Sequence, residues 1–266
     1  MSEVTLELIK ELREKTGAGV MDAKEMLKEA EGDIEKAIEL LRKKGDKIAL
    51  KKQSREAKEG VISFAEEGNK LAVVELYCET DFVARNEDFI ASADALAKKL
   101  LADGPDTFKS WAQDELKNNL IVKVGENLQL GTFEIIEGEF VGSYLHTNKK
   151  VASVVVMSAD DKELAHNIAM QIAAMNPPYL SPTDVPEEEK NKEMEIYKEQ
   201  LVAENKPENV MEKIVEGKMQ KYYSEVCLLK QPYFQEDKKT IEDLIKESSD
   251  KLGKELEISK FVRYSL

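Results

Sequence analysis

The segment VISFAEEGNKLAVVELY, residues 61–77, has the side-chain pattern of two β-strands. Apolar and polar residues alternate with a period of two on both sides of a turn-prone stretch, Glu66–Asn69, which contains Gly68. This pattern predicts a β-hairpin. A little further on, FIASADALAKKLL (residues 89–101) returns to the spacing of an amphipathic helix. The sequence therefore predicts a hairpin followed by a helix.

A second hairpin–helix unit follows along the chain. VGSYLHTNKKVASVVVM (residues 141–157) is another hairpin-like run, and LAHNIAMQIAAM (residues 164–175) is another helix, so the two units form an internal repeat. The connection from strand to helix is SADDKE in the second unit and the much longer CETDFVARNED in the first. Long connections inside compact units are usually functional or disordered, and this one lacks the Gly and Ser content of a flexible linker. Its aromatic residue, Phe82, is therefore a candidate site residue.

Three short helices are expected before the first hairpin. Residues 5–16 carry apolar side chains at helical spacing and end at Gly17, where a left-handed C-cap is wanted. Residues 21–30 repeat the pattern, and Asp33 is a suitable N-cap for a third helix. Residues 42–58 are rich in lysine and poor in apolar anchors, which indicates a linker with some helical content. A solvated tether is favoured there over a nucleic-acid contact.

A helical hairpin is expected at about residues 183–228. Two strongly helical stretches, EEEKNKEMEIYKEQLVAE and ENVMEKIVEGKMQKYYSEV, are separated by Asn205–Lys206–Pro207, and their apolar positions suit two antiparallel helices. Thr240–Leu252 predicts one more helix, and EISKFVRYSL a final strand. The predicted fold class is α+β. Its predicted divisions are a three-helix domain with linker (residues 1–54), a first core subdomain (55–140) and a second core subdomain with the inserted hairpin (141–266).

The charge and composition point to a protein partner in the cytoplasm. The formal net charge of −14 repels phosphate backbones, so no direct nucleic-acid binding is expected. The amino-terminal residues lack the apolar core of a secretion signal, and no run approaches the ~20 apolar residues of a membrane helix. Cys78 and Cys227 stand in apolar contexts and are expected to be buried free thiols in a reducing compartment.

The sequence contains no recognisable constellation for chemical catalysis. The two histidines, His146 and His166, are not part of a nucleophile motif, and surface or capping roles are favoured for both. The two cysteines are far apart, and no paired histidine spacing for a metal exists. A phosphate-binding glycine loop is also missing. We therefore expect no catalytic residue, no metal site and no cofactor, and a protein that acts by binding.

Five segments, in order, resemble the translation elongation factor Ts family: TGAGVMDAKEML (16–27), ETDFVARNEDF (79–89), NIAMQIAA (167–174), IVEGKMQKY (214–222) and QPYF (231–234). The resemblance runs from about Leu6 to Leu266. It implies a ubiquitin-associated-like head made of the three helices, a two-part α+β core and a protruding helical hairpin. It also implies a guanine-nucleotide exchange factor that binds elongation factor Tu and promotes release of GDP.

The resemblance implies a set of site residues. In that family the T-D-F-V stretch dislocates the partner's magnesium, and the matching positions are Thr80, Asp81, Phe82 and Val83. The remaining expected partner contacts are Leu12, Val20 and Met21 of the head, and Gln171 and Ile172 of the helix that presses on the partner's phosphate-binding loop.

Several alternatives remain open at this point. The Phe82 ring could instead fold back on its own subdomain, and Leu12 could be a core residue. Asp81 could be an N-cap or a turn former. Gln171 stands where some members of the family carry histidine, so no role that requires an imidazole is expected of it. A non-catalytic adaptor built on the head is the alternative function, and a homodimer or 2:2 complex is left open.

Overall fold

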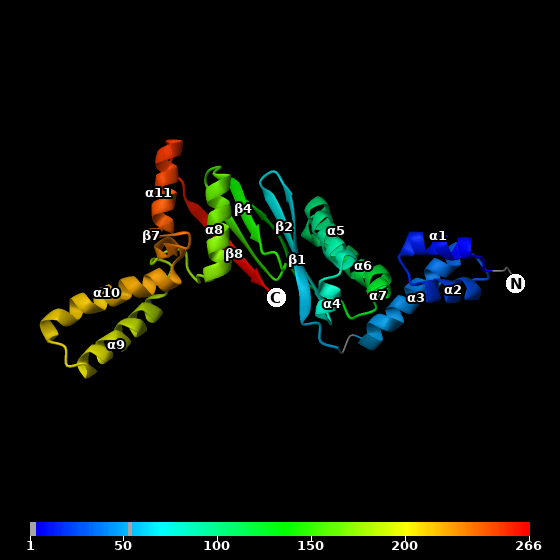
Figure 1. Ribbon diagram of the computed structural model, residues 1–266, viewed down its shortest axis with the longest axis horizontal. Helices are drawn as coiled ribbons and strands as arrows, with labels where there is room; N and C mark the ends of the chain where they lie inside the picture. Colours follow the sequence, from blue (N-terminus) through cyan, green and yellow to red (C-terminus); the bar gives the residue numbers. More distant parts are fainter. Residues whose placement is uncertain (1–3, 53–54) are drawn as a thin grey trace. The chain divides into compact units, whose positions relative to one another are not determined.

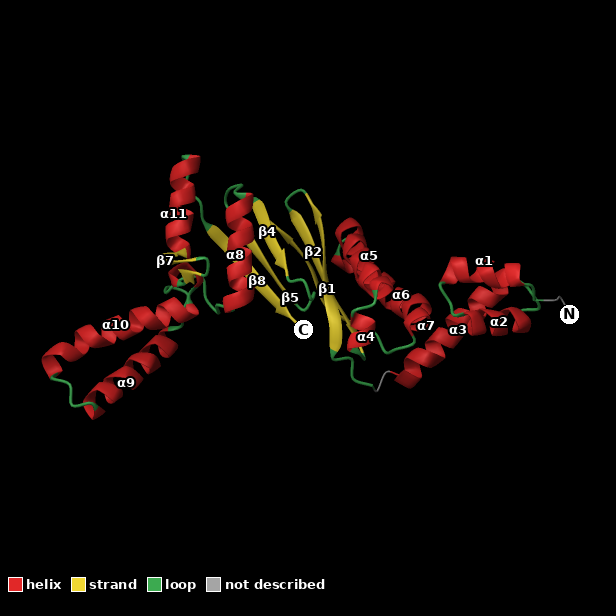
Figure 2. Ribbon diagram, in the orientation of Figure 1, coloured by secondary structure: helices red, strands yellow, loops and turns green. Residues whose placement is uncertain are grey.

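A computed structural model of the protein describes residues 4–52 and 55–266 (Figure 1). Helices and strands are mixed along the chain, as the predicted α+β class requires (Figure 2). The chain divides into two compact units. Unit 1 comprises the described residues up to Glu137, together with Leu145–Val151 and Ser265–Leu266, and unit 2 comprises Gly138–Tyr144 and Ala152–Tyr264.

Unit 1 begins with three helices, α1 (Leu6–Thr16), α2 (Val20–Glu29) and α3 (Ile34–Lys52), packed around a small apolar core. Gly17 ends α1 with φ at 68°, a left-handed conformation that favours glycine. Helix α3 runs to Lys52, so most of the stretch interpreted as a linker is helical. The linker prediction at residues 53 and 54 lies outside the described residues.

The sheet of unit 1 has the order β1 (Glu59–Glu67), β2 (Lys70–Cys78), β3 (Gln129–Glu137), and all pairs are antiparallel. The register places Glu66 opposite Leu71, which confirms the hairpin and its turn. Helix α5 (Glu87–Asp103) packs on the sheet through a buried apolar side, and α6 (Pro105–Glu115) follows it (Figure 2). A π-helical turn (Leu116–Leu120) and the short α7 (Ile121–Val124) then lead to β3.

Unit 2 contains the second repeat. Its sheet has the order β4 (Phe140–Leu145), β5 (Val151–Met157), β8 (Ile258–Ser265), and α8 (Lys162–Met175) lies on it (Figure 1). Gly142 allows this approach, because a Cβ at that position would overlap the Cβ of Ala165 on α8. The buried Ser153 hydroxyl of β5 donates to the Ala169 carbonyl of α8 at 2.5 Å, which ties the helix to the strand.

Two long helices, α9 (Glu187–Ala203) and α10 (Glu208–Val226), pack against each other and are joined by residues 204–207 (Figure 1). Three side chains between them are buried: Leu201, Val215 and Met219. A 3-10 turn (Leu228–Lys230), a small hairpin of β6 (Pro232–Tyr233) and β7 (Glu236–Thr240), and α11 (Ile241–Leu252) complete the unit.

Candidate partner-binding site

The connection between β2 and α5 is an ordered, doubly capped turn. Thr80 is extended, with φ −124° and ψ 152°, and its hydroxyl accepts a hydrogen bond from the Val83 amide at 3.4 Å, which starts the one-turn helix α4 (Asp81–Ala84). Asn86 then caps α5 by accepting from the amides of Asp88 and Phe89. We expected a loop here. The two caps explain why a helical turn forms instead.

Helix α4 presents Phe82 to solvent. The ring is 84% exposed, whereas the following residues face inward: Val83 packs against the core of unit 1 and Ala84 is buried. Because consecutive helical residues point in different directions, anchoring Val83 and Ala84 turns Phe82 outward. The alternative in which the ring folds back onto its own subdomain is therefore wrong for this structure. We name residues 80–83 the α4 tip.

The polar residues of the α4 tip, Thr80 and Asp81, interact with other groups of the chain. Asp81 forms a surface ion pair with Arg85, with 3.1 Å between Oδ2 and Nη2, and its side chain remains 42% exposed. The N-cap role that was open for Asp81 belongs to Thr80. Phe82 is thus the apolar group that the tip presents, beside a carboxylate with surface still accessible.

The head residues divide into two classes. Val20 and Met21 open α2 directly after the helix N-cap Gly19 and are 48% and 77% exposed. Leu12, in contrast, has no exposed surface and lies in the core between the three helices. The expected partner contact of Leu12 is therefore corrected to a core role, because packing against α2 and α3 leaves it no surface to offer.

Gln171 and Ile172 also have no exposed surface. The Gln171 amide nitrogen donates to Gln231 Oε1 at 3.1 Å and to the Pro232 carbonyl at 3.2 Å, and its oxygen accepts from the Phe234 amide at 3.1 Å. In place of the direct partner contact expected for this residue, the structure shows a side chain that holds the β6–β7 hairpin. The expectation for Ile172 is corrected in the same way, since it lies in the core of unit 2.

Two features of the site region were missed by sequence reasoning. Phe234, in the quoted QPYF segment, is 47% exposed, although nothing in its local pattern separates it from the buried Tyr233 beside it. Glu126 hydrogen-bonds to the α4 tip from 46 residues away in the sequence, so no local signal could reveal it.

Within the described residues, no group of three or more His, Cys, Asp or Glu residues is placed to hold a metal ion. Cys78 and Cys227 are free and buried, and burial raises the pKa of Cys78 to about 12 and of Cys227 to about 11, so both are protonated thiols near neutral pH. In the described part of the chain, no helix has the length and apolar character needed to cross a membrane.

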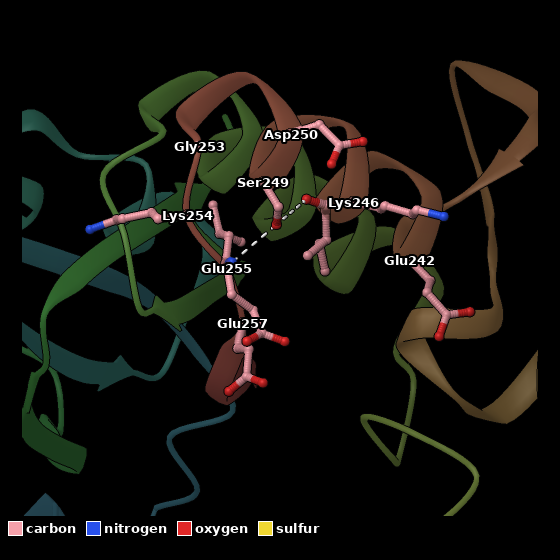
Figure 3. Close-up of a pocket in the computed structure, with 10 residues that line it drawn as sticks. Glu242, Lys246, Ser249, Asp250, Gly253, Lys254, Glu255 and Glu257 are labelled. Atoms are coloured by element: carbon pink, nitrogen blue, oxygen red, sulfur yellow. Dashed lines mark hydrogen bonds between the residues drawn. The ribbon is translucent and has the colours of Figure 1, made fainter.

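An open hollow of about 650 Å³ is lined by one side of α11 and by the segment that follows it, residues 253–257 (Figure 3). It is lined by carboxylates and lysines, among them Glu242, Lys246, Asp250 and Glu257. The one hydroxyl shown there, of Ser249, donates to the Ile245 carbonyl at 2.9 Å and accepts from the Leu256 amide at 3.0 Å, as part of the link from the helix to the strand that follows. Both printed partners of this hydroxyl are backbone groups, so its role here is structural.

The candidate site thus consists of exposed apolar side chains at the starts of two helices, Phe82 on α4 and Val20 and Met21 on α2. Comparisons with known proteins identify the family. A family model described as Elongation factor TS matches residues 79–266. Among curated relatives named Elongation factor Ts, the protein of Desulfovibrio desulfuricans is 39% identical over 283 aligned positions, covering 100% of this chain and 99% of the relative.

Two further relatives of the same name extend this result. The Chloroherpeton thalassium protein is 40% identical over 286 positions, covering 100% of this chain and 99% of the relative, and the Nitratidesulfovibrio vulgaris protein is 41% identical over 277 positions, covering 99% and 96%. The chain therefore belongs to the elongation factor Ts family. This confirms the resemblance found in the sequence and gives the protein a role in translation elongation.

Proposed function

We propose that the protein is a guanine-nucleotide exchange factor that binds elongation factor Tu in its GDP form, displaces the bound magnesium and promotes release of GDP. The observation that carries the proposal is the 84% exposure of Phe82 on a short helix capped at its start. A rigidly held, solvent-exposed aromatic ring is suited to insertion into a pocket of a partner.

Exchange of this kind needs no acid, base or metal ligand from the factor. If the factor binds the nucleotide-free partner better than the nucleotide-bound partner, linkage requires that the nucleotide and the factor weaken each other by the same ratio. Each ~1.4 kcal/mol of this coupling is a tenfold loss of nucleotide affinity. Retention of a nucleoside diphosphate depends on its magnesium and on backbone amides, so an inserted ring that displaces them promotes release.

The head supplies a second contact in this proposal. Val20 and Met21 are adjacent and exposed at the start of α2, which suits an apolar contact with the nucleotide-binding domain of the partner. Leu12, Gln171 and Ile172 then act indirectly, since they form the cores that position the exposed residues. Partnership with a translation GTPase also favours a cytoplasmic location.

The test is stopped-flow release of a fluorescent GDP from elongation factor Tu at limiting factor. Moving a Phe side chain from water into a pocket is worth about 2–3 kcal/mol. Phe82→Ala is therefore expected to slow stimulated release by up to about 30- to 150-fold. Val202→Ala removes methyl groups from another exposed apolar residue, on α9, and is expected to match the wild-type protein.

Two results would count against the proposal. Stimulated release that is unchanged in Phe82→Ala would remove the insertion mechanism. A wild-type protein that binds elongation factor Tu without accelerating release would favour the adaptor, the alternative function raised by the three-helix head.

A further inference from the structure

The α4 tip is fastened by residues that the site prediction did not include. Glu126 lies between α7 and β3, and its carboxylate accepts three hydrogen bonds, one from Glu79 just before the tip and two from Thr80, its first residue. Oε2 accepts from the amides of Glu79 and Thr80 at 2.9 and 3.1 Å, and Oε1 accepts from the Thr80 hydroxyl at 2.6 Å. Hydrogen bonds to an ionised carboxylate are among the stronger ones in proteins.

The contact is reciprocal. The Glu79 carboxylate accepts from the main-chain amide of Asn127 at 2.6 Å and from the Arg55 guanidinium at 3.2 Å. The side chain of Asn127, a residue only 4% exposed, donates to the Arg55 carbonyl at 2.7 Å. Each of two chain segments, 79–80 and 126–127, thus presents a carboxylate to the main-chain amides of the other. We name these four residues the carboxylate clasp.

The position of the clasp explains its form. Strands β2 and β3 pair antiparallel up to Tyr77 opposite Gln129, and the backbone ladder stops there. Just beyond this point the chain must turn into α4 on one side and arrive from α7 on the other. Main-chain amides left without a ladder partner require another acceptor. The clasp supplies carboxylates in place of backbone carbonyls.

The polar groups of Thr80 show how the clasp reaches Phe82. The Thr80 hydroxyl donates its proton to Glu126 and at the same time accepts from the Val83 amide. Because the hydroxyl proton points to Glu126, a lone pair of the oxygen is left to cap α4. The Thr80 carbonyl accepts from the Ala84 amide, which closes the turn that carries Phe82, and also from the buried Cys78 thiol at 3.2 Å. Glu126 therefore fixes the residue from which α4 starts.

We propose that Glu126 is a positioning residue for nucleotide exchange: through the backbone and hydroxyl of Thr80, it holds the exposed Phe82 ring in the orientation in which it enters the partner. This inference rests on the function proposed above. It assigns no contact between Glu126 and the partner. Its distinguishing expectation is that loss of Glu126 matters for exchange only while Phe82 is present.

The first experiment is a double-variant cycle in the GDP-release assay, with the full chain. Glu126→Ala removes the three acceptor contacts and is expected to slow stimulated release by about tenfold, equivalent to about 1.4 kcal/mol. Added to Phe82→Ala, it is expected to change the rate less than about twofold, because there is no ring left to orient. Glu126→Gln keeps an oxygen for the two amides and is expected to retain most of the activity. Glu67→Ala, an exposed carboxylate at the β1–β2 turn, controls for the charge change.

The second experiment reports on the tip without any partner. Amide hydrogen exchange of Thr80 and Val83 is expected to become at least about tenfold faster in Glu126→Ala, while the amides of β1 and the centre of β2 exchange as in the wild-type protein. If Glu126→Ala does not fold, Thr80→Val replaces it: only the hydroxyl is lost, exchange at Val83 is expected to accelerate, and Thr80→Ser is expected to restore protection.

The outcomes separate this inference from the proposed function. If Phe82→Ala has no effect on release, the proposed function fails, and the exchange of the Thr80 and Val83 amides still decides whether Glu126 orders the tip. If Phe82→Ala slows release but Glu126→Ala leaves it unchanged, the positioning role is overturned. The positioning role also fails if the two variants multiply their effects in the double variant, or if the tip amides stay protected without Glu126.

Discussion

The hydrogen bonds of Gln171 give a quantitative test of what holds unit 2 together. The side chain has no exposed surface and joins Gln231, Pro232 and the Phe234 amide through three hydrogen bonds. Gln171→Leu keeps a similar volume but removes the partner of each group. The Gln231 side chain is fully buried, so its oxygen loses its partner outright, at about 1–3 kcal/mol. The groups of Pro232 and Phe234 lie near the surface, where water replaces part of the loss.

We therefore expect Gln171→Leu to lower the free energy of unfolding by about 2–3 kcal/mol. Urea unfolding followed by circular dichroism measures this as a lower midpoint with an unchanged slope. Gln171→His keeps one donor and one acceptor, and its loss is expected to fall between those of leucine and the wild-type protein.

The matched control is Gln220→Leu, the same substitution at an exposed position of α10, expected to stay within about 0.5 kcal/mol of the wild-type protein. A Gln171→Leu midpoint no lower than that of this control would refute the reasoning. It would mean that the three hydrogen bonds contribute nothing beyond what water offers.

Two further predictions concern packing and pH. Gly142→Ala is expected to destabilise the protein by about 1–3 kcal/mol because the added methyl group meets Ala165. Gly217 has open space around it on α10, so Gly217→Ala is expected to stabilise the protein by about 0.5–1 kcal/mol. Denaturant unfolding of both variants measures the two changes in the free energy of unfolding. Burial raises the pKa of Cys78 to about 12 and of Cys227 to about 11, so the unfolded thiols ionise first as pH rises above 9, and the free energy of unfolding is expected to fall from there upward. Near neutral pH, labelling by a thiol reagent is expected to require unfolding, and rapid labelling of the folded chain would contradict this.

The sequence predicted those parts of the fold that depend on local patterns. The β1–β2 hairpin has alternating side chains around its own turn, and α5 and α8 have continuous apolar sides, so each is visible within a short window. The segment from α6 to β3 received no prediction. Strand β3 owes its place to pairing with β2, more than 50 residues away, as in the pair of Val74 with Phe133. Such pairing leaves no mark in a local pattern.

The candidate site was predicted less evenly than the fold. The exposed positions of Phe82, Val20 and Met21 agree with a partner-binding role, which stays a proposal. Helical spacing does not say which side of a helix its neighbours will cover, and for this reason Leu12 and Gln171 could not be assigned to the interior beforehand. Glu126 could not be predicted as a site residue, because it lies between two elements, where the sequence has no periodic pattern.

The chain segments that make up unit 1 determine how this protein can be divided into fragments for expression. Residues 145–151 belong to unit 1, where the Ile62 amide of β1 donates to the Lys149 carbonyl and Lys150 pairs with Glu59. A fragment that stops at the predicted boundary, residue 140, would lose these contacts and leave the Ile62 amide at the β1 edge without its carbonyl acceptor. Exposed edge strands can pair with the strands of other chains, so such a fragment would tend to self-associate during purification. Recombinant pieces of the amino-terminal half should therefore carry the chain through Val151.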